Sequence, residues 1–245
     1  MNKFIVVLAL FFVIFSGISQ DFKPVKTAQD VVDNYITASG GKNALASIES
    51  ISMKGNMGDG EQKGTIVIYF SKKYVYMDIN TAQFSMQQAI DVGKKKGWMK
   101  FGTMIKDLKE EEIEKNSKNV EGSMWGNFID PKKHGITFEM LQNETIDGKE
   151  CYVIDLIRDS MATSTSYFDM KTFNKVREIK GGMTNDFSDF REVGSTGITM
   201  PYSIKSQTGD VAMTEIKFNS KFNKKLLTRP KEESDDSKKD ENDSK

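Results

Sequence analysis

The residue types that most often carry out catalysis are scarce in this chain. Among 245 residues there is one histidine, His134, and one cysteine, Cys151. A Ser-His-Asp triad would have to be built on His134, which follows Asp130-Pro131 in a loop. A catalytic base needs a positioned partner, so we interpret His134 as a solvated loop residue. Cys151 lies in an apolar run, and we predict that it is buried rather than reactive.

Other polar residues also fail to form a recognisable site. A single cysteine excludes an internal disulfide and a cysteine-cluster metal site, and a single histidine excludes a histidine-rich one. Asp186 and Asp189 could form a carboxylate pair, but nothing in the sequence orients them. Gly181-Gly182 does not match a phosphate-binding loop. We therefore predict that the protein is not an enzyme and uses no metal or cofactor.

Methionine offers a different kind of chemistry. The chain has 14 methionines, and this flexible, polarizable side chain suits irregular apolar ligands. Met77, Met86, Met99 and Met104 all lie in the stretch where strands are predicted. Two interpretations remain open for them: they line an adaptable lipid cavity, or they fill an ordinary core.

The charge balance limits the class of partner. Lys and Arg number 35 and Asp and Glu number 35, so the formal net charge is zero. Nucleic-acid binding needs a basic surface, so we expect no nucleic-acid partner. Hydrophobic residues make up 38% of the chain, which is enough for a buried core.

The N-terminal residues resemble an export signal. Lys3 precedes an apolar run from Phe4 to Phe15, and the small residues Gly17 and Ser19 follow. This pattern predicts a signal peptide of residues 1–19. The run is shorter than the ~20 apolar residues of a membrane span. No cysteine follows the cleavage site, so we expect a mature protein that is periplasmic, without a lipid anchor or a transmembrane helix.

The other end of the chain is strongly polar. Residues 229–245 read RPKEESDDSKKDENDSK and contain no aliphatic or aromatic side chain. Such a segment buries too little surface to offset the entropy of ordering, so we predict a disordered charged tail. Residues 20–228 remain, and with no internal linker they are predicted to form one domain.

Hydrophobic periodicity predicts helices at the start of that domain and strands after it. Thr27–Gly40 has an N-cap at Thr27 and an apolar stripe of helical spacing, a short helix is expected at 43–48, and 107–118 reads as an exposed charged helix. From Ser50 onward, alternating residues and turns such as Asp147-Gly148 predict about ten consecutive, antiparallel strands. A large sheet of this kind must cover its apolar face, and the N-terminal helices are the available cover.

Several short segments resemble LolA-like outer-membrane lipoprotein-sorting proteins. The resemblance spans nearly all of residues 20–228. The segments are YITASGGKNAL at 35–45, DGKECYVID at 147–155, YFD at 167–169 with KVR at 175–177, REV at 191–193 after Phe190, and GITMPY at 197–202. The sequence departs from the family at one point. Family carriers use an arginine from an early strand, whereas the first arginine here is Arg158.

The resemblance implies an α+β fold, in which a strongly bent antiparallel half-barrel has helices over its concave face. It further implies an apolar cavity that takes acyl chains, and a periplasmic carrier or chaperone that acts in outer-membrane lipoprotein sorting. The implied partners are an acylated lipoprotein or lipid and an outer-membrane acceptor protein, with the carrier itself a monomer. The alternative is a module of the same fold that senses the state of the envelope or binds a protein, without transport.

The predicted ligand-binding residues lie on the helix stripe or alternate along the predicted strands. They are Val31, Val32, Tyr35, Ile66, Ile68, Phe70, Val75, Met77, Phe84, Met86, Trp98, Tyr152, Ile154 and Leu156.

Overall fold

The computed structural model describes residues 21–58, 63–123, 125–207 and 209–231. The strands of this part of the chain form one antiparallel sheet of 14 strands, more than the ten or so that the sequence indicates. The predicted signal peptide lies outside the described residues, and so does the tail beyond Lys231. The domain limits therefore stay a prediction.

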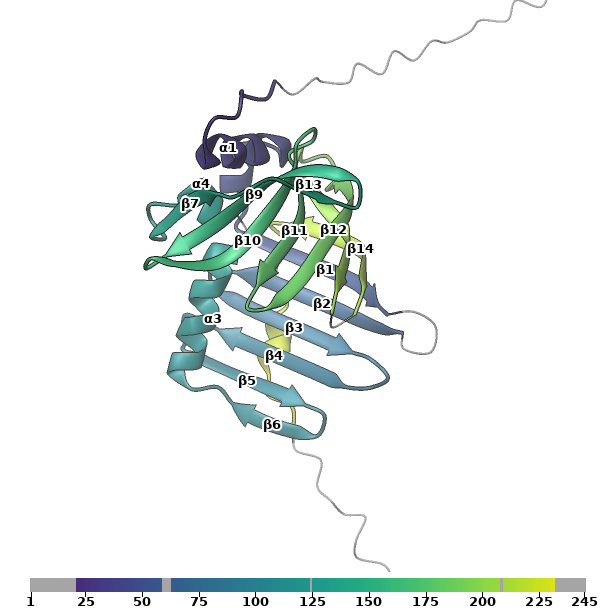
Figure 1. Ribbon diagram of the computed structural model, residues 1–245. Helices are drawn as coiled ribbons and strands as arrows, with labels where there is room; N and C mark the ends of the chain where they lie inside the picture. Colours follow the sequence, from purple (N-terminus) through teal and green to yellow (C-terminus); the bar gives the residue numbers. More distant parts are fainter. Residues whose placement is uncertain (1–20, 59–62, 124, 208, 232–245) are drawn as a thin grey trace, which may run out of the picture.

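Two halves of the chain meet in the middle of the sheet, where β1 (Ser50–Met57) pairs with β14 (Val211–Phe218). Beyond β1 follow, in order, β2 (Gly64–Ser71), β3 (Tyr74–Asn80), β4 (Ser85–Asp91), β5 (Lys96–Phe101) and β6 (Met104–Asp107). Beyond β14 follow β13 (Thr199–Ser206), β12 (Met183–Glu192), β11 (Lys175–Lys180), β10 (Met161–Asp169), β9 (Lys149–Arg158) and β7 (Ile136–Met140), while β8 (Glu144–Ile146) pairs with β9. The end strands β6 and β7 do not pair with each other, so the sheet is unclosed. In Figure 1 the strands of the β9–β12 half run across the direction of those of the β2–β6 half.

The first predicted helix is confirmed as α1 (Ala28–Ala38), and local chemistry fixes both of its ends. Thr27 and Asp30 form a capping box, in which each side chain accepts a hydrogen bond from the other residue's backbone N–H. The helix ends at Ala38, and two residues later Gly40 has a φ of +121°, at a position where an added Cβ would lie 2.6 Å from the carbonyl oxygen of Gly197. Glycine thus allows the helix end to lie against the β12–β13 loop, and α2 (Lys42–Ala46) follows.

Alternation along the strands gives the sheet two different faces. Ile66 and Ile68 of β2 belong to the main buried cluster, which also contains the α1 stripe. We call this the inner face. Residues of both halves of the sheet, including Phe168 of β10, join the same cluster. Val67 and Tyr69 lie on the opposite, outer face with a separate cluster.

The helix expected at 107–118 corresponds to α3 (Glu110–Ser123), which a short α4 (Gly126–Ile129) follows. Figure 1 shows α3 beside the ends of the strands of the β2–β5 half. Ile113 is only 1% exposed and packs with Val75, Ile90 and Leu108. The prediction of an exposed helix is therefore wrong for the side of α3 that carries Ile113.

The outer face is apolar as well, and the residues after β14 cover it. Phe222 packs with Tyr76, Ala89 and Trp98. The indole Nε1–H of Trp98 donates to the carbonyl oxygen of Leu227, at 3.0 Å, in the 3-10 helix η2 (Lys224–Leu227). We call residues 221–227 the C-terminal strap.

Two truncations should separate the strap from the charged tail. Deleting residues 222–245 is expected to cost at least about 3 kcal/mol, since it removes the buried Phe222 with its leucine neighbours, and so to lower the melting temperature by roughly 6 °C or more. Deleting residues 229–245 should leave it nearly unchanged, because the ion pair between Arg229 and Asp107 is largely solvent-exposed. Equal melting temperatures for the two proteins would show that the strap does not stabilise the sheet.

Candidate functional site

A partly enclosed cavity of about 260 Å³ lies between α1 and the inner face of the sheet, where the two halves of the chain meet. Its walls come from α1, from β1 and β2, from β11 to β14, and from Trp125 before α4. The lining residues are Tyr35, Ser39, Ile51, Met53, Phe70, Trp125, Asn174, Lys175, Glu178, Phe187, Phe190, Thr199, Met200, Pro201, Ile204 and Met213. We call it the sheet cavity.

Apolar side chains make up most of this wall. Ile51 and Met213 are buried in the main cluster, whereas Met53 and Met200 are half-buried beside it. Three methionines thus reach one cavity, so its walls can adapt to ligands of irregular shape.

One charged pair interrupts the apolar wall. The ammonium Nζ of Lys175 lies 3.2 Å from Oε1 of Glu178, and the two side chains are only 17% and 21% exposed. The same Nζ lies 5.6 Å from the ring centre of Phe128 and 5.3 Å from that of Phe187. Burial lowers the pKa of Lys175, but Glu178 and Tyr35 outweigh this effect and raise it above its ordinary value. The lysine is therefore charged at neutral pH.

A β-bulge brings these two charges to the same face. Residues three apart on a regular strand point to opposite faces. In β11, however, Lys175 lies opposite Phe168 while Arg177 lies opposite Tyr167, so Val176 is the extra residue. Val176 packs into an outer cluster instead, and the pair faces the sheet cavity.

The structure brings most of the predicted binding residues together. Ten of them belong to the main buried cluster or pack against it: Val31, Val32, Tyr35, Ile66, Ile68, Phe70, Met77, Tyr152, Ile154 and Leu156. Tyr35 and Phe70 line the sheet cavity itself. Val75 also lies on the inner face, but it packs under α3 with Ile90.

Three predicted residues lie elsewhere. Trp98 lies on the outer face under the C-terminal strap, so placing it with the inner-face residues is corrected. Phe84 is 38% exposed in the turn before β4, where its ring stacks with that of Phe101 at 6.2 Å. Met86, opposite Ile79 and Phe101 in the register, lies half-buried near this exposed end of the sheet.

The sequence analysis did not predict the polar residues of the cavity wall. It also did not predict the lining residues that come from β12, β13 and β14. Met200 and Ile204 are four residues apart on β13, and this even spacing could have predicted that both face the cavity. Lys175 and Glu178 gave no such signal, because a bulge is not readable from residue spacing.

The remaining polar candidates have structural partners. Asp186 accepts hydrogen bonds from Arg177, and Asp189 accepts them from Arg191. Cys151 is free and fully buried, as predicted, and burial raises the pKa of its thiol. Among the described residues, no three His, Cys, Asp or Glu side chains gather where they could hold a metal ion.

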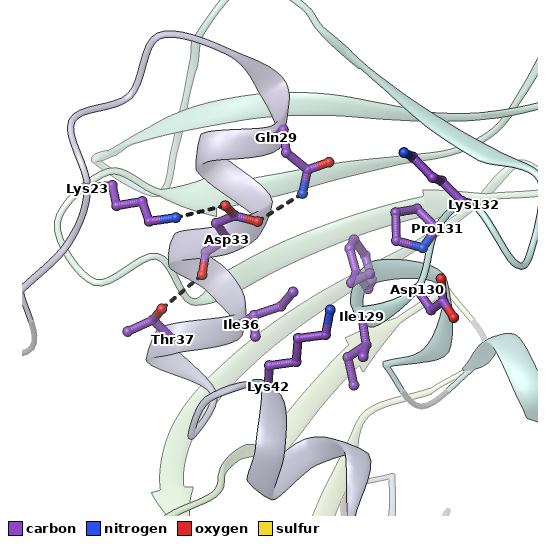
Figure 2. Close-up of a pocket in the computed structure, with 11 residues that line it drawn as sticks. Lys23, Gln29, Asp33, Ile36, Thr37, Lys42, Ile129, Asp130, Pro131 and Lys132 are labelled. Carbon is purple, nitrogen blue, oxygen red and sulfur yellow. Dashed lines mark hydrogen bonds and ion pairs between the residues drawn. The ribbon is translucent and has the colours of Figure 1, made fainter.

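A larger hollow, of about 500 Å³, lies on the surface beside α1 (Figure 2). The carboxylate of Asp33 accepts from Nζ of Lys23 at 3.1 Å and from Nε2 of Gln29 at 2.9 Å. Lys42 and Lys132 line the hollow together with Asp130, so charges of both signs alternate around it. We interpret this hollow as a solvated polar groove rather than an apolar ligand site.

No helix in the described ranges is long and apolar enough to cross a membrane. No family model and no curated protein matches the chain.

Solved structures of similar fold exist. A LolA superfamily protein of Nitrosomonas europaea is 13% identical, with a TM-score of 0.48, over 84% of this chain and 99% of that one. An outer-membrane lipoprotein-sorting protein domain of Vibrio parahaemolyticus is 10% identical, with a TM-score of 0.43, over 82% and 95%. A DUF1329 family protein of Desulfovibrio piger is 10% identical, with a TM-score of 0.47, over 83% and 98%. At these identities the likeness concerns the fold alone.

Proposed function

We propose that the protein is a periplasmic carrier that holds acyl chains, or other elongated apolar groups, in the sheet cavity. The observation that carries the proposal is the wall of this cavity, in which methionine and aromatic side chains from α1 and from both halves of the sheet surround an unfilled space. Transfer of an acyl chain from water into such a space is favourable by about 0.8 kcal/mol per methylene.

The size of the cavity suits part of one chain. Its volume of about 260 Å³ lies just below the ~300–1,000 Å³ of typical small-molecule sites. Met53, Met200 and Met213 can change rotamer to widen it. In this proposal α1 is the cover of the inner face, and a longer chain makes room by shifting the helix and its stripe of Val31 and Val32.

The expected affinity is that of a carrier that also releases its cargo. Twelve buried methylenes contribute about 10 kcal/mol. Loss of translational and rotational freedom costs at least about 4 kcal/mol. The difference is at most about 6 kcal/mol, which corresponds to a Kd of tens of micromolar or weaker. The predicted signal peptide supports a periplasmic location, where the cargo would be an acylated lipoprotein or a lipid.

A dye titration tests the proposal. Native mass spectrometry first shows whether purified protein carries lipid, and the delipidated protein is then titrated with the neutral apolar dye N-phenyl-1-naphthylamine. Met53→Trp is expected to weaken dye binding about tenfold, because the indole fills the space that the ligand needs. Met183→Trp is the matched control, because Met183 is 52% exposed. A delipidated protein that takes up no dye, or equal affinity of the two variants, contradicts the proposal.

A protein-binding or sensing module is the second candidate, and a different observation favours it. Phe101 and Met104 are 50% and 62% exposed at the β5–β6 edge of the sheet, beside Phe84. Exposed apolar clusters of this kind are typical of interaction surfaces. If no dye enters the cavity, this second function becomes the better interpretation.

A further inference from the structure

The charges in the sheet cavity cancel, and this limits the head group of a ligand. Lys175 and Glu178 are the two charged residues of its wall. A free carboxylate bound to Lys175 would place a second negative charge beside Glu178, in a site where burial strengthens the repulsion. A neutral head group adds no charge and avoids this cost.

Lys175 still has hydrogen-bonding capacity that a neutral ligand can use. An ammonium group has three N–H donors, and within the described part of the chain its hydrogen bond goes to Glu178 at 3.2 Å. Its other surroundings are the rings of Phe128 and Phe187, which attract the cation but do not replace an acceptor oxygen. A carbonyl oxygen of a ligand can fill that role.

Two further polar groups lie nearby, and one of them is buried without a partner among the described residues. The half-buried side-chain amide of Asn174 lies in the cavity wall. Ser166 lies directly opposite Glu178 in the register, is 0% exposed, and its hydroxyl has no partner. Buried polar groups are ordinarily paired. This part of the inner face therefore has polar capacity that the protein itself does not use.

We propose that Lys175 anchors the head group of a neutral acyl ester or acyl amide, whose carbonyl oxygen accepts a hydrogen bond from the ammonium while the chain lies along the methionine-lined wall. Glu178 is the specificity-determining partner, which rejects free fatty acids by charge. The inference rests on the proposed function, since it names the ligand class of the same cavity.

The test compares two ligands with the same chain length but different head groups. Displacement of N-phenyl-1-naphthylamine is measured with monododecanoylglycerol and with dodecanoate at pH 7.5, both below their critical micelle concentrations. The wild-type protein is expected to bind the ester at least about tenfold more tightly, because dodecanoate places a second negative charge beside the half-buried Glu178 and the ester does not.

Three variants test whether Lys175 and Glu178 cause the preference for the ester over dodecanoate. Lys175→Met should weaken ester binding about tenfold, because the donor is lost. Glu178→Gln should shift the ratio of the two affinities toward dodecanoate by about tenfold, because Lys175 then lacks its counter-charge and the carboxylate meets no second negative charge. Lys180→Met is the control, since this lysine is exposed at the end of the same strand, and it should change neither affinity. Melting temperatures identify any variant that fails to fold. If Lys175→Met fails to fold, Glu178→Gln still tests the proposal.

The outcomes separate this inference from the function on which it rests. Dye uptake with equal affinity for the two ligands, or an unchanged ratio in Glu178→Gln, overturns the anchor and leaves the carrier function intact. Failure of the dye and of both dodecyl ligands to bind overturns the carrier function and the anchor together.

Discussion

Replacing Val32 by aspartate is expected to detach α1 from the sheet or to unfold the protein. Val32 is 0% exposed and belongs to the main buried cluster of apolar residues. An unpaired buried charge costs about 4 kcal/mol. For a domain of this size the melting temperature should fall by roughly 10 °C, and the midpoint of urea unfolding should fall with it.

Two control variants separate the charge from the loss of packing. Val32→Ala removes the side-chain methyl groups without adding a charge and should cost roughly 2 kcal/mol. Asn43→Asp adds a charge to an exposed position of the next helix, α2, and should stay within about 0.5 kcal/mol of wild type. If Val32→Asp were no less stable than Val32→Ala, α1 would not pack against the inner face as the structure places it.

Truncating Phe168 to alanine is the second change with a large expected effect. Phe168 is 0% exposed, and its ring centre lies 5.1 Å from that of Tyr35 in α1 and 6.3 Å from that of Phe128 in α4. Removing the ring leaves a cavity where β10 and the two helices meet. A loss of about 3–5 kcal/mol is expected, measured by chemical denaturation.

Phe101→Ala is the matched control for this truncation, since the side chain is 50% exposed and its loss should cost less than about 1 kcal/mol. A double-mutant cycle with Tyr35→Leu should in addition give a coupling of about 0.5–1.5 kcal/mol between Tyr35 and Phe168, because ring pairs at this distance interact beyond their buried area. Similar losses for Phe168→Ala and Phe101→Ala, or a coupling of zero, would contradict the packing described.

The sequence determined the features that depend on neighbouring residues. The Thr27–Asp30 capping box and Gly40 set the limits of α1 through contacts a few residues apart, so the prediction of 27–40 lies close to the helix observed. The turn at Asp147-Gly148 is equally local, since both residues have positive φ, and it joins β8 to β9 as expected. The stripe of Val31, Val32 and Tyr35 follows from helical spacing alone.

Only the tertiary structure decided which apolar residues share a cavity. Alternation separates the side chains of a strand into two sets, but it does not say which set faces inward when both are apolar. Trp98 looked like an inner residue because the strap that covers it lies more than a hundred residues later in the chain. The Lys175–Glu178 pair depends on a bulge at Val176, which arises from pairing with β10. Pairing between strands therefore brought Lys175 and Glu178 to one face of the sheet, while local sequence produced the helix that shares the cavity wall with them.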